Sequence, residues 1–264
     1  WLAAWWSDLA FWVLGVAVIA AVGWDAFSVR AVTFSQGADY WEHSATFRAL
    51  LDDPWHPANP HVATDESSPR FGPGFVLVAL FARALGLDAL GALGVASVLN
   101  ATAFVTGIFW FFRAYFRDRR ASLFGLIVFF CSWYDAWHYS NVYQLKIFFS
   151  VASYPSTLTL GVTLLGFSGT LHVLRCERER ALELTLLAVC WAFVFLTHPL
   201  TAALSFSGFV FLVAFEPGVP WRRRLVVGGT LLAGCVIASA WPYFQPWSVL
   251  SGGTRMEVDW VDDG

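Results

Sequence analysis

Long hydrophobic runs recur along almost the whole 264-residue chain, and this feature constrains the fold more than any other. Hydrophobic residues make up 58% of the sequence and charged residues only 13%. An average soluble domain is ~45–50% apolar and ~25% charged, so a water-soluble globule of this size is excluded. The 25 Phe and 15 Trp also exclude a disordered chain. The sequence therefore predicts an all-α, polytopic membrane protein.

Seven apolar runs are candidate membrane spans, for which the expected length is ~20 mostly apolar residues, within a range of ~17–25. They are Leu9–Phe27, Leu90–Phe112, Ala121–His138, Pro155–Leu174, Leu184–Leu196, Leu200–Phe215 and Leu225–Trp241. An eighth apolar run, Phe71–Leu85, is short for a span, begins with a Gly-Pro-Gly break and contains Arg83. We expect this run to lie in the membrane interface.

The arginines predict which side of the membrane each loop occupies. Three short segments contain ten of the 16 basic residues: Arg113, Arg117, Arg119, Arg120, Arg175, Arg178, Arg180, Arg222, Arg223 and Arg224. Short arginine-rich loops stay cytoplasmic, and the sequence between successive segments is long enough for two crossings. Segments 133–154, 197–199 and 242–264 are then predicted to be external. With seven spans, the N-terminus is cytoplasmic and residues 25–90 form a large external first loop.

An acidic motif, Asp39-Tyr40-Trp41-Glu42-His43, lies in this loop. At helical spacing Asp39, Glu42 and His43 are neighbours. A carboxylate beside an imidazole can act as a general base or bind a divalent cation. The alternative is a solvated helix start in which Asp39 is the N-cap and Glu42 completes a capping box. His56 and His61, on a proline-broken loop, are a weak signal for a metal, and we assign no metal ligand.

Three further polar residues, Arg70, Lys146 and His198, fall in predicted external segments. Lys146 is the only lysine in the chain. Cations near the membrane plane can bind a phosphate head group. The alternative for Lys146 is a side chain that extends to the interface without a ligand. The many Trp and Tyr residues near this boundary are typical of a membrane-interface belt.

The order of these features resembles the GT-C superfamily of polytopic glycosyltransferases, and the likeness covers nearly the whole chain. In that superfamily one span leads to an external loop with an acidic residue and two interface helices, and six further spans follow. The segments that carry the likeness are GADYWEHSATFRALL, SPRFGPGFVLVALFARALGLDAL, FWFFRAYFRDRRASLFGLIVFF and LTHPLTA. The resemblance places the two interface helices at Trp41–Leu51 and Phe71–Leu85.

The resemblance implies an inverting transfer of a sugar from a polyprenyl-phosphate donor to an acceptor hydroxyl on the outer face of the membrane. It implies a single transmembrane module over residues 1–264, without the C-terminal part that usually recognises the acceptor. Asp39 would be the catalytic base, and the substrate would be bound by Glu42, His43, Arg70, Lys146 and His198. No cofactor is assigned, although a divalent cation stays open. Many metal-dependent members have a second acid in the next external loop, where only Asp135 is available.

Two functions of other classes remain as alternatives. One is a non-catalytic polytopic subunit that scaffolds a larger membrane complex with other membrane subunits. The other is a transporter, although the predicted spans contain few polar side chains. The chain has no Walker A, GxGxxG, HExxH or GxSxG motif in a suitable context and no nucleic-acid-binding pattern. Rich in Ala, Val, Gly, Arg and Trp, it has the composition of a GC-rich bacterial source, so we expect a bacterial cytoplasmic-membrane protein of the cell envelope.

Overall fold

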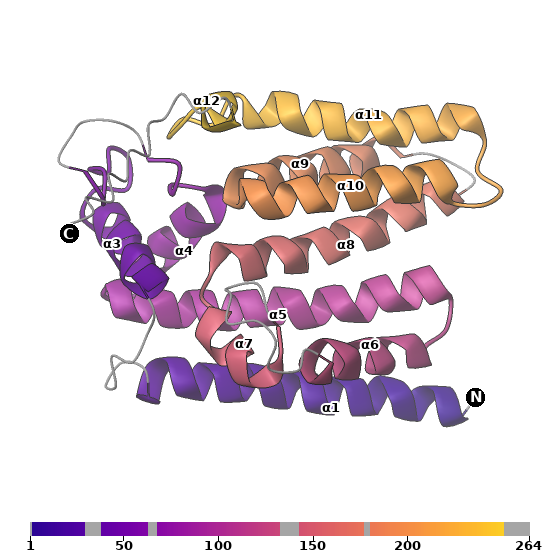
Figure 1. Ribbon diagram of the computed structural model, residues 1–264, viewed down its shortest axis with the longest axis horizontal. Helices are drawn as coiled ribbons and strands as arrows, with labels where there is room; N and C mark the ends of the chain where they lie inside the picture. Colours follow the sequence, from indigo (N-terminus) through magenta and orange to yellow (C-terminus); the bar gives the residue numbers. More distant parts are fainter. Residues whose placement is uncertain (1, 30–37, 63–67, 133–142, 177–179, 251–264) are drawn as a thin grey trace, which may run out of the picture.

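The structure is a computed structural model that describes residues 2–29, 38–62, 68–132, 143–176 and 180–250 (Figure 1). These residues form eleven α-helices and one π-helical segment, η1 (Asp25–Val29), and no β-strand occurs among them. The predicted all-α fold is therefore confirmed for the described part of the chain.

Seven helices lie side by side, and successive ones run in opposite directions (Figure 1). They are α1 (Leu2–Trp24), α5 (Ala89–Phe116), α6 (Arg120–Cys131), α8 (Pro155–Arg175), α9 (Ala181–Thr197), α10 (Pro199–Phe215) and α11 (Trp221–Ala238). Each overlaps one of the predicted apolar runs, and residues 133–138 of the run Ala121–His138 lie outside the described residues. The segments Trp5–Ser28, Ala89–Phe116 and Pro155–Arg175 are long and apolar enough to cross a membrane. The chain is therefore a membrane protein with three candidate spans among its described residues.

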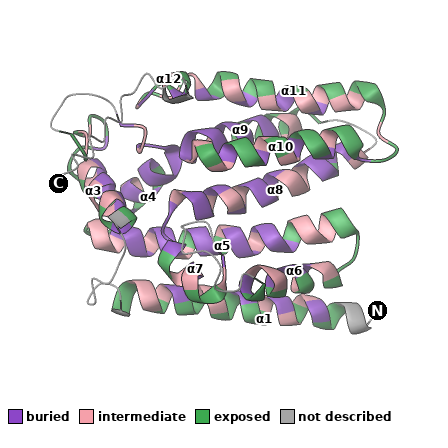
Figure 2. Cartoon of the chain, in the orientation of Figure 1, coloured by how far each residue is buried: buried purple, intermediate pink, exposed green. Residues whose placement is uncertain are grey.

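The helices α5 and α8 pack backbone against backbone at the centre of the bundle. A Cβ atom on Gly161 would lie 2.6 Å from the amide nitrogen of Phe104, and one on Gly107 would lie 2.6 Å from the carbonyl oxygen of Gly161. Both contacts are shorter than any real Cβ atom makes, so glycine is required at both positions. Figure 2 shows that buried residues are frequent along α5, α8 and α9, whereas α1, α10 and α11 are more exposed.

Large apolar side chains are exposed on the outer helices. Leu204, Phe215 and Val236 are 75%, 69% and 72% exposed. Large exposed apolar surfaces on a helical bundle are the pattern of a protein whose solvent is lipid. The burial pattern thus agrees with the apolar helix sequences.

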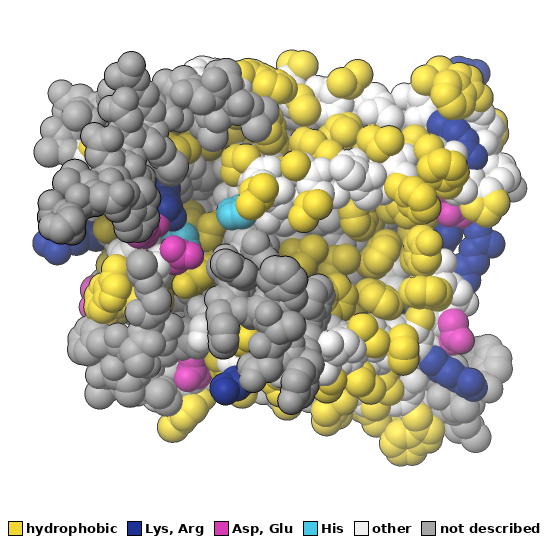
Figure 3. Space-filling model, viewed as in Figure 1, with side chains coloured by type: hydrophobic (Ala, Val, Ile, Leu, Met, Phe, Trp, Pro, Cys, Tyr) yellow, Lys and Arg dark blue, Asp and Glu magenta, His cyan; other side chains and the backbone are white. Residues whose placement is uncertain are grey.

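The described arginines of the three basic segments gather at one end of the bundle, here called the basic end: Arg113, Arg117, Arg119, Arg120, Arg175, Arg180, Arg222, Arg223 and Arg224. Figure 3 shows dark blue side chains at this end, where α5 and α8 finish. Ion pairs connect the helices there, including Arg113 Nη1 to Asp8 Oδ2 at 3.0 Å. Arg178 lies outside the described residues.

Two helices cross the opposite end of the bundle, α3 (Ala38–Asp52) and α4 (Pro73–Ala84) (Figure 1). The 12 residues of α4 span only about 18 Å at 1.5 Å per residue, well short of the ~30 Å hydrocarbon core. Pro73 begins the helix, where the missing N–H has no partner to lose. Gly86, at φ +66°, turns the chain after it. The run Phe71–Leu85 is therefore a short helix.

The inner face of α3 packs against α4 and the start of α5. Tyr40, Phe47 and Leu50 belong to the same buried apolar cluster as Phe75 of α4. Arg83 at the end of α4 donates hydrogen bonds to the carbonyl oxygens of Leu51 and Asp52, which joins the two helices.

Two short helices, α7 (Leu145–Val151) and α12 (Pro246–Leu250), complete the described structure. The segment between α11 and α12 contacts the loops around α3 and α4. The indole N–H of Trp241 donates to the carbonyl oxygen of Phe71 at 2.9 Å, and the hydroxyl of Tyr243 donates to that of Pro54 at 2.6 Å. These bonds hold the loops beside α3 and α4 against the segment that follows α11.

Candidate functional site

Four of the predicted site residues meet at the α3–α4 end of the bundle. Glu42 and His43 come from α3, Arg70 precedes α4, and His198 lies between α9 and α10. The guanidinium of Arg70 donates a hydrogen bond to Oε2 of Glu42, forming an ion pair. The two side chains keep 26% and 37% of their surface exposed. Both side chains of the pair are therefore partly accessible to a ligand.

His43 is the most buried member of this group, with 4% of its surface exposed. Its ring packs between Tyr154 and Phe75, at centroid distances of 4.8 and 5.4 Å. Burial, and then the positive charge of Arg70, lower the pKa of His43 to about 3. The imidazole is neutral at physiological pH, and its Nδ1 has no hydrogen-bond partner among the described residues.

His198 is oriented by the first turn of α10. The backbone N–H of Thr201 lies 3.2 Å from Nδ1 of His198, and the Thr201 hydroxyl lies 2.8 Å from the same atom. Because an N–H can only donate, Nδ1 is the acceptor, and the proton of the neutral ring is on Nε2. Burial and Arg70 also lower the pKa of His198. His198 is thus prepared to donate a hydrogen bond from Nε2.

His61 is a further member of this group that the sequence did not assign to it. Burial lowers the pKa of His61, the charge of Arg70 lowers it further, and Glu42 opposes them. His61 also contributes to the low pKa of His43. No periodic pattern connects position 61 with position 198, so only the folded chain reveals this proximity. We call Glu42, His43, His61, Arg70 and His198 the polar cluster.

Asp39 and Lys146 are both exposed. No hydrogen bond or ion pair within the described ranges joins either to the polar cluster. The inward face of α3 passes through Tyr40 and His43, which leaves Asp39 at its edge, in the first turn. Neighbours four residues apart on a helix still have Cβ atoms about 5–6 Å apart, so Asp39 lies next to His43. Asp135 lies outside the described residues.

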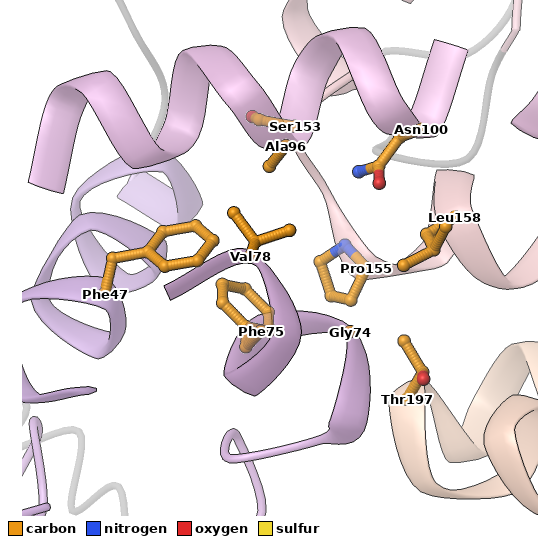
Figure 4. A pocket seen from close by; sticks show the side chains of 10 residues that line it. All are labelled: Phe47, Gly74, Phe75, Val78, Ala96, Asn100, Ser153, Pro155, Leu158 and Thr197. Carbon is orange, nitrogen blue, oxygen red and sulfur yellow. The ribbon is translucent and has the colours of Figure 1, made fainter. Parts of the chain in front are cut away.

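A small cavity lies between α4, α5 and the start of α8 (Figure 4). Asn100, Ser153 and Thr197 line it, and a polar oxygen of each is buried without a partner in the described structure. The amide nitrogen of Asn100 is occupied, since it donates to the carbonyl oxygens of Ala152 and Tyr154 at 2.9 and 3.1 Å. The cavity has a volume of about 10 Å³ for the centre of a water molecule, so it has room for about one water.

An apolar cavity of about 460 Å³ lies between α8 and α10, and its lining includes Thr201, which hydrogen-bonds His198 of the polar cluster. Leu160 and Phe167 of α8 line one side, and Leu200 and Leu204 of α10 line the other. Figure 3 shows hydrophobic side chains over this part of the surface. We call this feature the α8–α10 groove. Its lining joins the apolar side chains of α8 and α10 to Thr201, the residue that orients His198.

The described residues contain no group of three His, Cys, Asp or Glu side chains that could hold a metal ion. The polar cluster itself consists of the Arg70 guanidinium, the partly exposed carboxylate of Glu42 and three imidazoles whose pKa values are lowered. No protein-family model, curated protein or solved structure matches the chain.

Proposed function

We propose that the protein is an inverting membrane glycosyltransferase that takes a sugar from a polyprenyl-phosphate donor. The observation that carries the proposal is that Thr201, which lines the α8–α10 groove, hydrogen-bonds Nδ1 of His198, whose pKa is lowered in part by the charge of Arg70. A polyprenyl-phosphate sugar needs an apolar surface for its polyprenyl chain and hydrogen-bond donors for its phosphate. The surface and the donors must lie close enough for one donor molecule to contact both. The resemblance of the sequence to the GT-C superfamily supports the same reaction.

Donor binding follows from the chemistry of the two side chains. The guanidinium of Arg70 can present two parallel N–H groups to phosphate oxygens, and Nε2–H of His198 can donate a third bond. Glu42 holds Arg70 in place before the donor arrives. The polyprenyl chain lies in the α8–α10 groove, and Lys146 on α7 supplies additional positive charge to the phosphate.

Asp39 is the proposed general base. It removes the proton from an acceptor hydroxyl, whose oxygen then forms a bond to the anomeric carbon of the sugar. The bond from that carbon to the phosphate oxygen breaks on the opposite face, which inverts the configuration. The leaving polyprenyl phosphate keeps the electron pair, and Arg70 stabilises its charge. The neutral His43 adds no positive charge that would hold the leaving group.

The proposed orientation has seven spans, a cytoplasmic N-terminus and the polar cluster on the external side of a bacterial cytoplasmic membrane. The separation of the basic end from the polar cluster supports it, because arginine-rich loops stay in the cytoplasm. The place of α4 also supports it, because this helix lies at one end of the bundle and not alongside the other seven helices (Figure 1). Cysteine substitution at Arg222 and at Trp55, followed by labelling from one side of sealed vesicles, tests this orientation.

The reaction is tested with purified protein in lipid vesicles. Polyprenyl phosphate is the first probe, because it is the leaving group whatever the sugar is. We expect the wild type to bind it and Arg70→Gln to bind about tenfold more weakly, since about 1.4 kcal/mol corresponds to a factor of ten. Asp39→Asn should bind it normally and lose sugar transfer from polyprenyl-phosphate-linked donors. The matched control is Asp52→Asn, an exposed acid at the other end of the same helix.

The outcomes separate the parts of the proposal. Full transfer by Asp39→Asn would refute the assignment of the base. Equal binding of polyprenyl phosphate by the wild type and by Arg70→Gln would refute the donor site.

A second candidate, a non-catalytic subunit of a membrane complex, is favoured by one observation. Arg70 already has a carboxylate partner in Glu42, and no ion pair within the described part of the chain joins Asp39 to Arg70. Purification in constant stoichiometry with other membrane proteins, without binding of polyprenyl phosphate, would select this candidate.

A further inference from the structure

The basic end contains a second site, which the proposed reaction does not use. A pocket of about 320 Å³ opens where α5, α8 and α10 finish. Its polar lining is formed by Tyr115, Arg117, Arg175 and Glu216, and its apolar lining is mainly Phe211 and Phe215. A pocket with arginines at one edge and aromatic side chains at the other has the amphipathic character of a phospholipid.

The charge of this pocket is positive. Glu216 is its only acidic lining residue, and the Glu216 side chain is 6% exposed. Its Oε1 accepts hydrogen bonds from Nε of Arg175 at 2.7 Å and from Nη2 of Arg117 at 3.2 Å. One carboxylate therefore faces two guanidinium groups. A third, that of Arg224, donates to the backbone oxygen of Glu216 at 2.6 Å.

Two of these arginines are occupied by the helix ends. Arg175 also donates to the carbonyl oxygen of Ala114, and Arg224 donates to that of Val213. The last carbonyl groups of a helix lack partners within the helix and carry partial negative charge, so these bonds are structural. They also offset the negative ends of α5 and α10, which would otherwise repel an anion.

Arg117 is the cation that remains available. Its side chain is 65% exposed, and the bond to Glu216 is the only one it makes to another described residue. A guanidinium has five N–H donors, so most of them are left for a ligand. Glu216 stays paired with Arg175 when Arg117 binds a ligand. The buried carboxylate of Glu216 is therefore not left without a partner.

The apolar side of the pocket lies on the outer face of α10. Phe211 and Phe215 are 55% and 69% exposed, and their rings are 4.9 Å apart between centroids. In a membrane-embedded bundle these rings would contact lipid chains rather than water. An acyl chain along them would place its headgroup beside Arg117.

We propose that this pocket binds an anionic phospholipid, with the phosphate on Arg117 and the acyl chain along Phe211 and Phe215. The net positive charge selects a headgroup of net negative charge over a zwitterionic one, whose ammonium group would be repelled by the arginines. Basic pockets between membrane helices are suited to anionic headgroups for this reason. The site is at the opposite end of the bundle from the polar cluster, so the proposal is independent of sugar transfer.

The test measures lipid binding to the full-length protein in a neutral detergent by native mass spectrometry, with phosphatidylglycerol and phosphatidylcholine as probes. We expect phosphatidylglycerol to bind the wild type more tightly. Arg117→Gln should weaken it about tenfold, or about 1.4 kcal/mol, and Arg117→Lys less. The matched control is Arg222→Gln, which removes an exposed arginine at the same end but outside the pocket and should change little. Circular dichroism checks folding.

Each other result overturns the proposal. Unchanged affinity in Arg117→Gln would remove the site, and an equal loss in Arg222→Gln would show diffuse attraction to the basic end. If millimolar inorganic phosphate displaces phosphatidylglycerol completely, the pocket is a site for a soluble anion. Should Arg117→Gln not fold, Phe211→Ser gives a second measurement, because it should weaken phosphatidylglycerol binding without any change of charge.

Discussion

Acidification should destabilise the protein through His43, and replacing His43 with phenylalanine should remove this effect. The pKa of His43 is about 3 in the folded chain, against an ordinary value of 6.5. Between these values the unfolded chain binds a proton that the folded chain excludes, so stability falls as the pH falls. Above pH 6.5 neither state is protonated, and the contribution vanishes.

The magnitude follows from the difference between the two pKa values. Each pKa unit corresponds to about 1.36 kcal/mol. At pH 5, about 1.5 units below the ordinary pKa, the wild type should have lost about 2 kcal/mol relative to pH 7.5 through this one residue. The full loss, reached only near pH 3, is roughly 5 kcal/mol. Because His43 is 4% exposed, solvent screening reduces these values little.

The assay is unfolding of the purified protein in mixed micelles, followed by circular dichroism at pH 7.5 and at pH 5, for the wild type and His43→Phe. The new ring packs differently against Phe75 and Tyr154, but this packing difference is the same at both pH values and cancels. His61 and His198, whose pKa values are also lowered, titrate equally in both proteins. The stability difference should therefore shift by about 2 kcal/mol in favour of His43→Phe at pH 5. An equal difference at both pH values would refute a neutral, buried His43.

Three further substitutions test the packing. Gly161→Ala should lower the free energy of unfolding by about 1–3 kcal/mol, because the new Cβ would meet the backbone of Phe104. The control is Gly229→Ala, whose new Cβ would have nothing within 4 Å. Equal unfolding curves for the two variants would contradict the close approach of α5 and α8. Asn100→Ala leaves two buried carbonyl oxygens without their donor and should cost about 1–3 kcal/mol, measured by the same unfolding assay; no change would show that water replaces the amide. Glu216→Gln should lower the melting temperature by several degrees, at about 2–4 °C per kcal/mol for a chain of this size, because its two arginines lose their counter-charge; an unchanged melting temperature would mean that the ion pairs contribute nothing.

The amino-acid sequence was sufficient to predict where the bundle helices lie. Apolar runs of limited length, with Pro155 and Pro199 at helix starts, specify helices locally, because backbone hydrogen bonds in lipid must be satisfied within the same segment. The short length of Phe71–Leu85 likewise predicted a helix too short to span. The arginine segments predicted a common basic end, since alternate crossings return the chain to the same side.

Only the tertiary structure decided which polar residues meet. Glu42 could be read as half of a capping box or as a ligand-binding acid, and the ion pair with Arg70, 28 positions away, shows that the carboxylate turns to Arg70. Likewise, His61 and His198 influence the same cluster although no spacing rule joins them. Helical periodicity places residues on one face of one helix, whereas contacts between distant segments depend on how several helices pack together, and that is a property of the whole bundle.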